Sequence, residues 1–427
     1  MSHPAACASG ATPAPALRLL LPVAIAGFVC VVSALSYRAI TNLNVPGHPH
    51  DAHWALQDFR DAVYYPVVSL LAGHNPYDAA AYTRTYPVRS SFPLYSPLTL
   101  LIHLPFGLLP YRTAEAVYYA LTLVLTVVLA RLTLNACGLA STPARVLGLA
   151  ALLLISRPGQ MNLLGGQTTV AVVIGAYAAL HLARTRPWLA GLGLALSTLK
   201  PTFGLPLTVL LLARRDIRPV RIGWTIGGIL AGGVVAVLVH NAGGVEPFLA
   251  SLGVNSSAFL VNPANQTTSS ISRLDALALL GRLLGRTPAL AVQLAVGLGI
   301  LGLGAFVVHR LADNGRDERA QHLSAAVVCL TVLTCTYHQA YDLLLLAWPV
   351  TALAAGRWKP RPRERGMWRW TLLALLAFPA GNYLTSATVI DTIGITGIWW
   401  TAVASLNGAA LLAALSVCTL RSLSENR

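Results

Sequence analysis

The sequence is poor in charged residues, and especially in acidic ones. Only 15 of its 427 residues are Asp or Glu, and all charged residues together make up 11% of the chain. A typical soluble domain contains about 25% charged residues. Hydrophobic residues account for 55%, and the mean hydropathy is +0.63. These values argue against a soluble enzyme and favour an integral membrane protein.

The sequence also lacks the short motifs of several enzyme classes. It contains no GxxxxGK[ST] phosphate-binding loop, no HExxH metal-binding motif and no GxSxG nucleophile motif. Its six cysteines are scattered without a CxxC pair, so we expect neither a disulfide framework nor a zinc site. No internal repeat is evident, which weakens the case for a transporter built from inverted repeats.

Lysine is almost absent, with only Lys200 and Lys359, although the formal net charge is +15. Most basic residues lie in short connections between apolar runs, for example in 213–221 and 356–369. Cytoplasmic loops of membrane proteins carry this excess. We therefore interpret the charge as a sign of membrane topology and expect no nucleic-acid partner.

The apolar runs predict a polytopic all-α membrane protein that forms one transmembrane domain over residues 1–427. The first run follows Arg18 and is interpreted as a retained signal anchor. Several runs are shorter than the roughly 20 residues that cross a bilayer. Such short helices are tolerated at membrane depth only inside protein or beside a cavity, which predicts an internal site. Spans are expected near 19–37, 96–109, 114–134, 146–156, 170–183, 188–199, 203–213, 223–240, 289–308, 322–336, 343–355, 370–388 and 394–418.

Two polar segments are too long to be simple connections. With the N-terminus in the cytoplasm, residues 38–95 and 241–288 are predicted to form long external loops, and residues 336–342 are placed on the same side. The spans counted from the two ends disagree by one crossing. A re-entrant half-helix at 146–156 would remove that mismatch.

Three aspartates cluster in the stretch DAHWALQDFRDAVYYP, residues 51–66. Asp58 and Asp61 are three residues apart, so a helix would place them on roughly one face. Tyr64 lies one turn further along, and Pro66 is expected to kink or end the helix. A carboxylate at the mouth of a cavity can act as a general base. The alternative is a pair of solvated carboxylates on an interfacial helix.

Two further segments combine charged and polar residues with helix breaks. Lys200 precedes Pro201 between two apolar runs, and a lysine at membrane depth indicates a functional role unless it extends to the headgroups. His338 and Asp342 are four residues apart, so a helix would place them on one face. They form a candidate dyad or a phosphate-binding pair.

These motifs, in their order along the chain, resemble glycosyltransferase family 87, a membrane family of the GT-C superfamily. The resemblance covers roughly residues 50–345. Its strongest part is the early aspartate followed by GHNPYD. The other matching motifs are SFPLYSPL (91–98), GGQTTV (165–170), LKPTFGLPL (199–207), NQTTSSISR (265–273) and YHQAYD (337–342).

The resemblance implies a GT-C fold with about 11–13 transmembrane helices and a polyprenyl-phosphate-mannose donor. The acceptor would be a glycolipid such as a phosphatidylinositol mannoside or lipomannan, joined by an inverting reaction that gives an α-(1→2) linkage. Asp58 would be the general base. The donor phosphate would meet Lys200, His338, Arg89 and Arg273. Supporting residues would be Asp61, Tyr64, Asn75, Tyr95, Gln167 and Asp342.

The resemblance further implies a plasma-membrane enzyme whose site faces the external side, with no nucleotide and no other cofactor. Because no tight carboxylate cluster is present, we also expect no metal. Ser96 departs from the aromatic-Pro-Pro pattern that is common in the family. An arabinofuranosyl or another polyprenyl-linked sugar remains an alternative donor. A transporter or flippase of lipid-linked intermediates is the alternative from another class.

Overall fold

The computed structural model describes residues 15–42, 55–313, 317–358 and 367–424, so Asp51 lies outside the described residues. These residues form helices and connecting segments without a β-strand, which confirms the all-α prediction. The first half of the chain contains α1 (Pro15–Ile40), α2 (Gln57–Phe59), the π-helical turn η1 (Arg60–Tyr64), α3 (Tyr65–Leu71), α4 (Ala79–Thr85), α5 (Leu98–Ile102), α6 (Leu104–Gly107), α7 (Tyr111–Ala136), α8 (Pro143–Ile155), α9 (Arg157–Gly165), α10 (Thr169–His181), α11 (Pro187–Ser197) and α12 (Pro201–Ala213). The second half contains α13 (Ile217–Asn241), α14 (Val245–Val261), α15 (Ala276–Leu284), α16 (Leu290–Ala312), α17 (Glu318–Cys335), the 3₁₀ helix η2 (Ala340–Leu346), α18 (Ala347–Ala354), α19 (Met367–Gly381), the 3₁₀ turn η3 (Tyr383–Thr385), α20 (Ala387–Ile393) and α21 (Gly397–Ser424).

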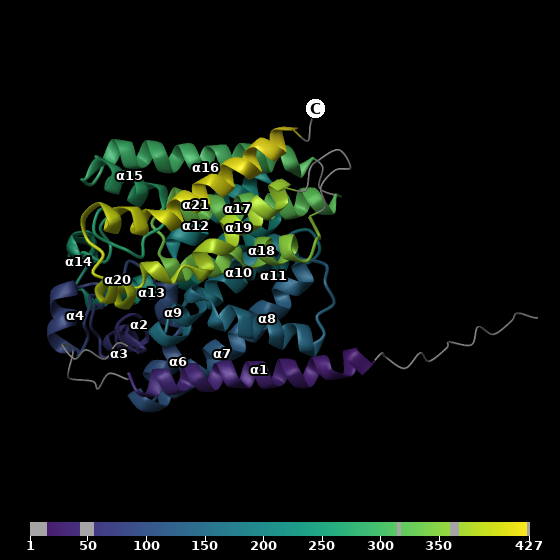
Figure 1. The fold of residues 1–427 in the computed structure, drawn as a ribbon. Helices are drawn as coiled ribbons and strands as arrows, with labels where there is room; N and C mark the ends of the chain where they lie inside the picture. Colours follow the sequence, from purple (N-terminus) through teal and green to yellow (C-terminus); the bar gives the residue numbers. More distant parts are fainter. Residues whose placement is uncertain (1–14, 43–54, 314–316, 359–366, 425–427) are drawn as a thin grey trace, which may run out of the picture.

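The long helices run side by side in one bundle. In Figure 1, α1 lies along one edge and α16 and α21 lie along the opposite edge. In the described part of the chain, five helices are long and apolar enough to cross a membrane, namely α1, α7, α13, α16 and α21. The predicted number of 11–13 spans is larger than five because the prediction also counts shorter apolar runs. The structure contains these runs as short apolar helices, such as α10, α11 and α12. The apolar outer surface and these helices identify a polytopic membrane protein.

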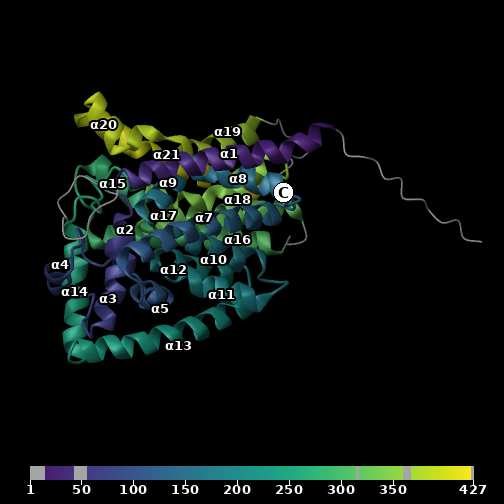
Figure 2. The same cartoon turned by 90° about the horizontal axis from the view of Figure 1, so that it is seen from below.

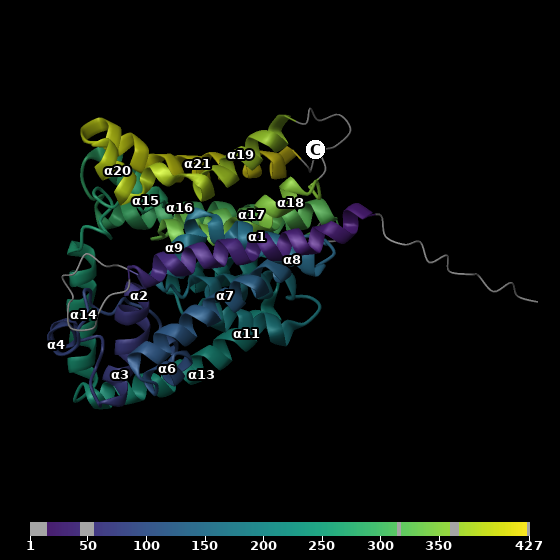
Figure 3. The same ribbon diagram turned by 60° about the horizontal axis from the view of Figure 1, so that its bottom comes forward.

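One end of the bundle carries the short helices. Figures 2 and 3 show α3, α4 and α14 gathered there, with α13 forming an outer edge that leads into α14. Contacts between α4 and α14 join the segments that the sequence assigns to the two long external loops. The second of these segments is largely helical, because α14 and α15 occupy most of it.

The run at 96–109, predicted as one span, is instead two short helices, α5 and α6. Pro97 precedes α5, and Pro105 stands in the first turn of α6. Proline has no N–H to donate and obstructs the preceding turn, so a continuous helix cannot form through this run. The run therefore packs at one end of the bundle and does not cross it as a single helix.

Pro66 stands near the start of α3, directly after the π-helical turn η1. The segment from Gln57 to Leu71 is helical throughout, so Pro66 does not end the helix, and the helix changes its type directly before this proline. Proline cannot donate a backbone hydrogen bond, which disfavours a regular α-helix through this position.

The pair α8 and α9 is bent by 79°, the geometry of a broken span or a re-entrant loop. Ser156 is extended (ψ 151°), and its hydroxyl accepts a hydrogen bond from the N–H of Gly159 at 3.2 Å. Pro158 occupies the first turn of α9. A Cβ at Gly159 would lie 1.8 Å from the carbonyl oxygen of Leu153, so only glycine fits this bend. The bend agrees with the half-helix expected near residues 146–156.

Candidate active site

Asp58 lies on a short helix that is anchored by its neighbours. Leu56 adopts a left-handed backbone conformation (φ 55°) before α2, and its N–H donates to the carbonyl oxygen of Leu164 at 2.6 Å. Phe59 is fully buried, with its ring centroid 4.7 Å from that of Tyr118. The backbone around Asp58 is therefore held from both sides.

The GGQTTV segment approaches this helix closely. Gly166 has a φ of +73°, and a Cβ at this position would lie 2.6 Å from the Cβ of Phe59. Glycine alone allows both the left-handed backbone and the close approach. This approach places the side chain of Gln167 against Asp58.

Asp58 faces a cavity of about 380 Å³, which we call the Asp58 cavity. Five segments distant in sequence form its wall, and four of them lie in the stretches 38–95, 241–288 and 336–342 that the sequence assigns to one side of the membrane. Asp58 is the only acidic residue among the described residues that line it. The lining residues are Gln57, Asp58, Ser90, Ser91, Pro93, Tyr95, Met161, Gly165, Gln167, Phe259, Asn262, Ala264, Asn265, Tyr337, Gln339 and Tyr341.

A short hydrogen bond fixes the Asp58 carboxylate. Gln167 Nε2 donates to Asp58 Oδ2 at 2.5 Å, which leaves the other carboxylate oxygen for a substrate. Burial, and to a lesser extent the charge of Asp61, raise the pKa of Asp58 to about 6, although Lys200 and Gln167 oppose the shift. A carboxylate with this pKa is charged near neutral pH and able to accept a proton.

Asp61 does not face the cavity but holds part of its wall. Arg60 Nε donates to its carboxylate at 2.7 Å, and the backbone N–H groups of Arg89 and Ser90 donate to it at 3.1 and 3.0 Å. Its carbonyl oxygen accepts a hydrogen bond from the hydroxyl of Tyr82 at 2.8 Å. Asp61 therefore anchors the segment that carries Ser90 into the cavity wall.

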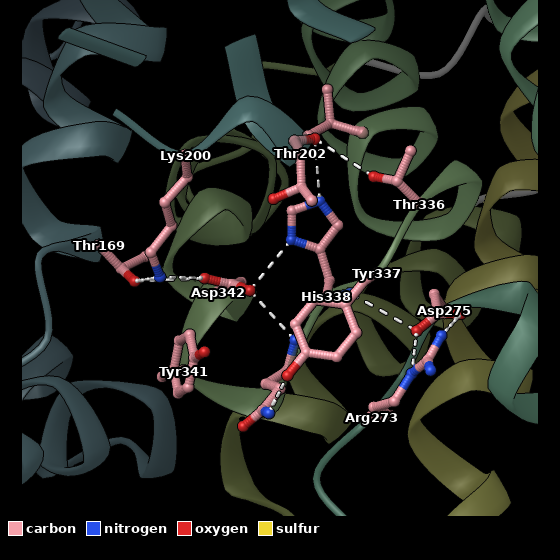
Figure 4. Close-up of polar contacts among 12 residues, drawn as sticks. Thr169, Lys200, Thr202, Arg273, Asp275, Thr336, Tyr337, His338, Tyr341 and Asp342 are labelled. Atoms are coloured by element: carbon pink, nitrogen blue, oxygen red, sulfur yellow. Dashed lines mark hydrogen bonds and ion pairs between the residues drawn. The ribbon is translucent and has the colours of Figure 1, made fainter. Parts of the chain in front are cut away.

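A buried polar network stands behind the cavity (Figure 4). Lys200 Nζ donates to Thr169 Oγ1 at 2.6 Å and to Asp342 Oδ1 at 3.2 Å. Its ammonium group lies over two aromatic rings of the cavity wall, 4.3 Å from the centroid of Tyr341 and 5.7 Å from that of Tyr95. Lys200 thus brings positive charge to the back of the cavity.

His338 is joined to the same network. Its Nδ1 is 3.0 Å from Asp342 Oδ2, and its Nε2 is 3.3 Å from the carbonyl oxygen of Thr202. The predicted contact between the two residues is present, but His338 precedes η2 and does not share a helix with Asp342. It is 0% exposed and packs edge-on against Phe203. In this arrangement His338 orients Asp342 and does not reach the cavity.

The two arginines predicted at the donor phosphate occupy different environments. Arg273 pairs with both oxygens of Asp275 at 2.8 and 2.9 Å, donates to the carbonyl oxygen of Asn265 at 2.7 Å and lies over Tyr337 (Figure 4). Its side chain therefore holds the loop that lines the cavity. Arg89 is exposed and adjoins Ser90 in the sequence, but it is not among the residues that line the cavity.

Of the remaining predicted residues, some line the Asp58 cavity and others lie elsewhere. Tyr95 and Gln167 line the Asp58 cavity. Tyr64 packs among aromatic rings, and its hydroxyl donates to the carbonyl oxygen of Leu109 at 3.0 Å. Asn75 lies in a different cavity, where its side chain donates to Ser251 at 2.8 Å.

The sequence-based prediction did not assign several residues of the cavity wall and of the polar network behind it. Thr169 joins Lys200 to Asp342, and Tyr341 and Gln339 face the cavity. All three lie inside motifs that the sequence singles out, GGQTTV and YHQAYD. Phe259 comes from the end of α14, which carries no such signal.

An apolar groove of about 410 Å³ lies next to this site, and Tyr95 lines both the groove and the Asp58 cavity. Residues of α12, α13 and α14 form its walls, among them Leu205, Trp224 and Phe248. Pro201, next to Lys200, also lines it. We call it the Tyr95 groove.

Among the described residues, no three His, Cys, Asp or Glu side chains come close enough to hold a metal ion. The expectation of a metal-independent reaction remains a prediction.

The model of glycosyltransferase family 87 matches residues 93–336, which is more than half of the chain. The match includes Gln167 and Lys200, whereas Asp58 and His338 lie outside it. No curated protein and no solved structure matches the chain.

Proposed function

The chain belongs to glycosyltransferase family 87, and from this we propose that it transfers a mannosyl residue from polyprenyl-phosphate-mannose to a hydroxyl group of a lipid-anchored glycan. Asp58 acts as the general base. The new linkage is α-(1→2), and the acceptor is of the phosphatidylinositol mannoside or lipomannan type. The enzyme lies in the plasma membrane with the Asp58 cavity open to the external side.

One observation carries this proposal. A cavity lined by polar and aromatic residues contains one carboxylate among the described residues, and a neighbouring amide fixes that carboxylate. A general base must lie within hydrogen-bonding reach of the proton that it removes. Asp58 meets this requirement for any hydroxyl group placed against its free oxygen.

The reaction is a single displacement at the anomeric carbon. The acceptor oxygen forms a bond to that carbon while the bond between the carbon and the phosphate oxygen breaks. Asp58 takes the hydroxyl proton, and polyprenyl phosphate leaves with the electron pair of the broken bond. One displacement inverts the configuration, so a β-linked phosphate donor gives an α-glycoside.

The surroundings of Tyr95 support a lipid-linked donor. The Tyr95 groove is almost entirely apolar and shares Tyr95 with the Asp58 cavity, which suits a prenyl chain whose phosphate lies near the cavity. Lys200 lies behind the rings of Tyr95 and Tyr341. Its positive charge would stabilise the negative charge that develops on the departing phosphate. Arg89, whose neighbour Ser90 lines the cavity, is a second candidate cation for the phosphate.

The test is a transfer assay with purified protein, polyprenyl-phosphate-mannose and a phosphatidylinositol mannoside acceptor. Asp58→Asn preserves the shape of the side chain but cannot accept the proton. We expect it to lower the transfer rate about 10²–10⁴-fold, the usual contribution of a general base. Asp391→Asn, at an exposed carboxylate on α20, is the matched control and should keep the wild-type rate.

Full transfer by Asp58→Asn would refute the assignment of the base. If the enzyme transfers arabinofuranose or another sugar and rejects mannose, the proposed mannosyl donor is wrong and the polyprenyl-phosphate donor carries that other sugar. Movement of a lipid-linked intermediate across liposomes without any transfer product would favour the flippase alternative.

A further inference from the structure

A second polar cavity of about 320 Å³ lies at the same end of the bundle as the Asp58 cavity. It opens between the α3–α4 connection and the junction of α13 with α14. His74, Asn75 and Asp78 of the motif GHNPYD line this second cavity, and no residue of that motif lines the Asp58 cavity. We call it the Asn75 cavity.

Hydrogen bonds between distant segments build its walls. Asn75 Oδ1 accepts from the N–H of Tyr77 at 3.1 Å, and its Nδ2 donates to Ser251 Oγ on α14 at 2.8 Å. Asn241 Nδ2, at the end of α13, donates to the carbonyl oxygen of His74 at 3.2 Å. The cavity is therefore part of the folded structure and does not depend on a single loop.

The cavity offers hydrogen-bonding groups that the protein leaves unused. Ser69 is only 1% exposed, and it lines the cavity. One oxygen of Asp78 accepts from the N–H of Ala81 at 3.0 Å, which leaves the second oxygen for a ligand.

The charges of the wall identify the class of ligand. Among the described lining residues there is no Lys or Arg, His74 is the only basic side chain and Asp78 is the only acidic one, so the wall does not offer the cluster of cations that a phosphate would require. The rings of Tyr82 and Tyr86, 5.6 Å apart, add flat apolar surfaces. Hydroxyl, amide and carboxylate groups beside aromatic rings suit a neutral polyhydroxyl ligand. The volume falls within the range of small-molecule sites, about 300–1,000 Å³.

Asp61 connects this cavity to the Asp58 cavity. Its carbonyl oxygen accepts from Tyr82, which lines the Asn75 cavity, and its carboxylate binds the backbone of Ser90, which lines the other. We propose that the Asn75 cavity binds a neutral sugar unit of the acceptor glycan, remote from the unit that receives the new residue. This proposal rests on the proposed function, because it takes the acceptor to be a glycan.

The first test measures binding and needs no catalysis. Saturation-transfer NMR detects the binding of mannotriose to the purified full-length Asp58→Asn protein. Ala81→Phe and Thr85→Phe each place a ring in the Asn75 cavity and should abolish at least half of the signal. Ala80→Phe makes the same change on the exposed face of α4, outside this cavity, and should leave the signal unchanged. Equal signals in all four proteins would overturn the proposal.

The second test compares acceptors of different length in the transfer assay. In Ala81→Phe and Thr85→Phe, kcat/KM should fall about tenfold more for an acceptor with four sugar units than for one with a single unit. In Ala80→Phe, the ratio of kcat/KM for the four-unit acceptor to kcat/KM for the one-unit acceptor should stay at the wild-type value. An equal loss for both acceptors would mean a general structural defect and would refute the remote subsite. If no acceptor is used but mannotriose still binds, the proposed function fails while the sugar site stands.

Discussion

Replacing Gln167 with alanine removes the hydrogen bond that its amide donates to Asp58 at 2.5 Å. This bond stabilises the charged carboxylate and so lowers its pKa, against the effect of burial. A hydrogen bond to a charged group contributes about 1.5–3 kcal/mol. One pKa unit corresponds to about 1.4 kcal/mol. We therefore expect the pKa of Asp58 to rise by about one to two units in Gln167→Ala.

The sign of the effect on activity follows from the proposed role of Asp58 as a base. The carboxylate must be deprotonated, so transfer is lost as the pH falls through the pKa, which is about 6 in the wild type. In Gln167→Ala the acid limb of the profile should move to about pH 7–8. Activity at pH 7 should fall about twofold to tenfold relative to the wild type and recover in part at pH 9.

The assay measures kcat/KM for the acceptor between pH 5 and pH 9, with the donor at a saturating concentration. Gln57→Ala is the matched control, because Gln57 also lines the cavity and makes no hydrogen bond to Asp58 among the described residues. Its acid limb should stay near pH 6. An unchanged limb in Gln167→Ala, or the same shift in both variants, would refute the link between this hydrogen bond and the base.

Three further predictions concern the donor and the position of the base. Lys200→Met removes the ammonium group beside Tyr95 and Tyr341 and should raise the apparent KM for the donor about tenfold or more; an unchanged donor titration would count against its role. Gly228→Leu adds a side chain in the Tyr95 groove, so it should lower transfer from long-chain polyprenyl donors more than transfer from short-chain donors. Gly232→Leu changes an open position on the same helix and should leave the ratio of the two transfer rates unchanged. Gly166→Ala sets a Cβ 2.6 Å from that of Phe59 and should reduce transfer more than tenfold, and a fully active variant would contradict the close approach.

The helical architecture was accessible from the sequence because it depends on local properties. Apolar runs of sufficient length predict spanning helices, and proline and serine predict their ends. The bend between α8 and α9 was expected from a run too short to cross. The run at 96–109 misled the prediction, because its hydropathy resembles a span and its prolines decide otherwise.

The candidate site was accessible only in part. Asp58 could be selected as a base because carboxylates are so rare in this chain, and its motif drew attention to it. Arg273 and His338 were reasonable phosphate ligands by residue type. Their actual partners, Asp275 for one and Asp342 for the other, depend on how distant segments pack. A charged side chain in a buried position takes the nearest compensating group, and spacing along the chain does not reveal which group that is.

The sequence by itself determined that this protein is helical and embedded in a membrane, because composition and the length of apolar runs set the free energy of burial in lipid. It also determined which polar segments interrupt those runs. Only the tertiary structure decided that Gln167 meets Asp58 and that Asn75 belongs to a separate cavity. These contacts join residues far apart in the sequence, so local properties do not determine them, and the approach of Gln167 to Asp58 depends on the close packing that Gly166 allows.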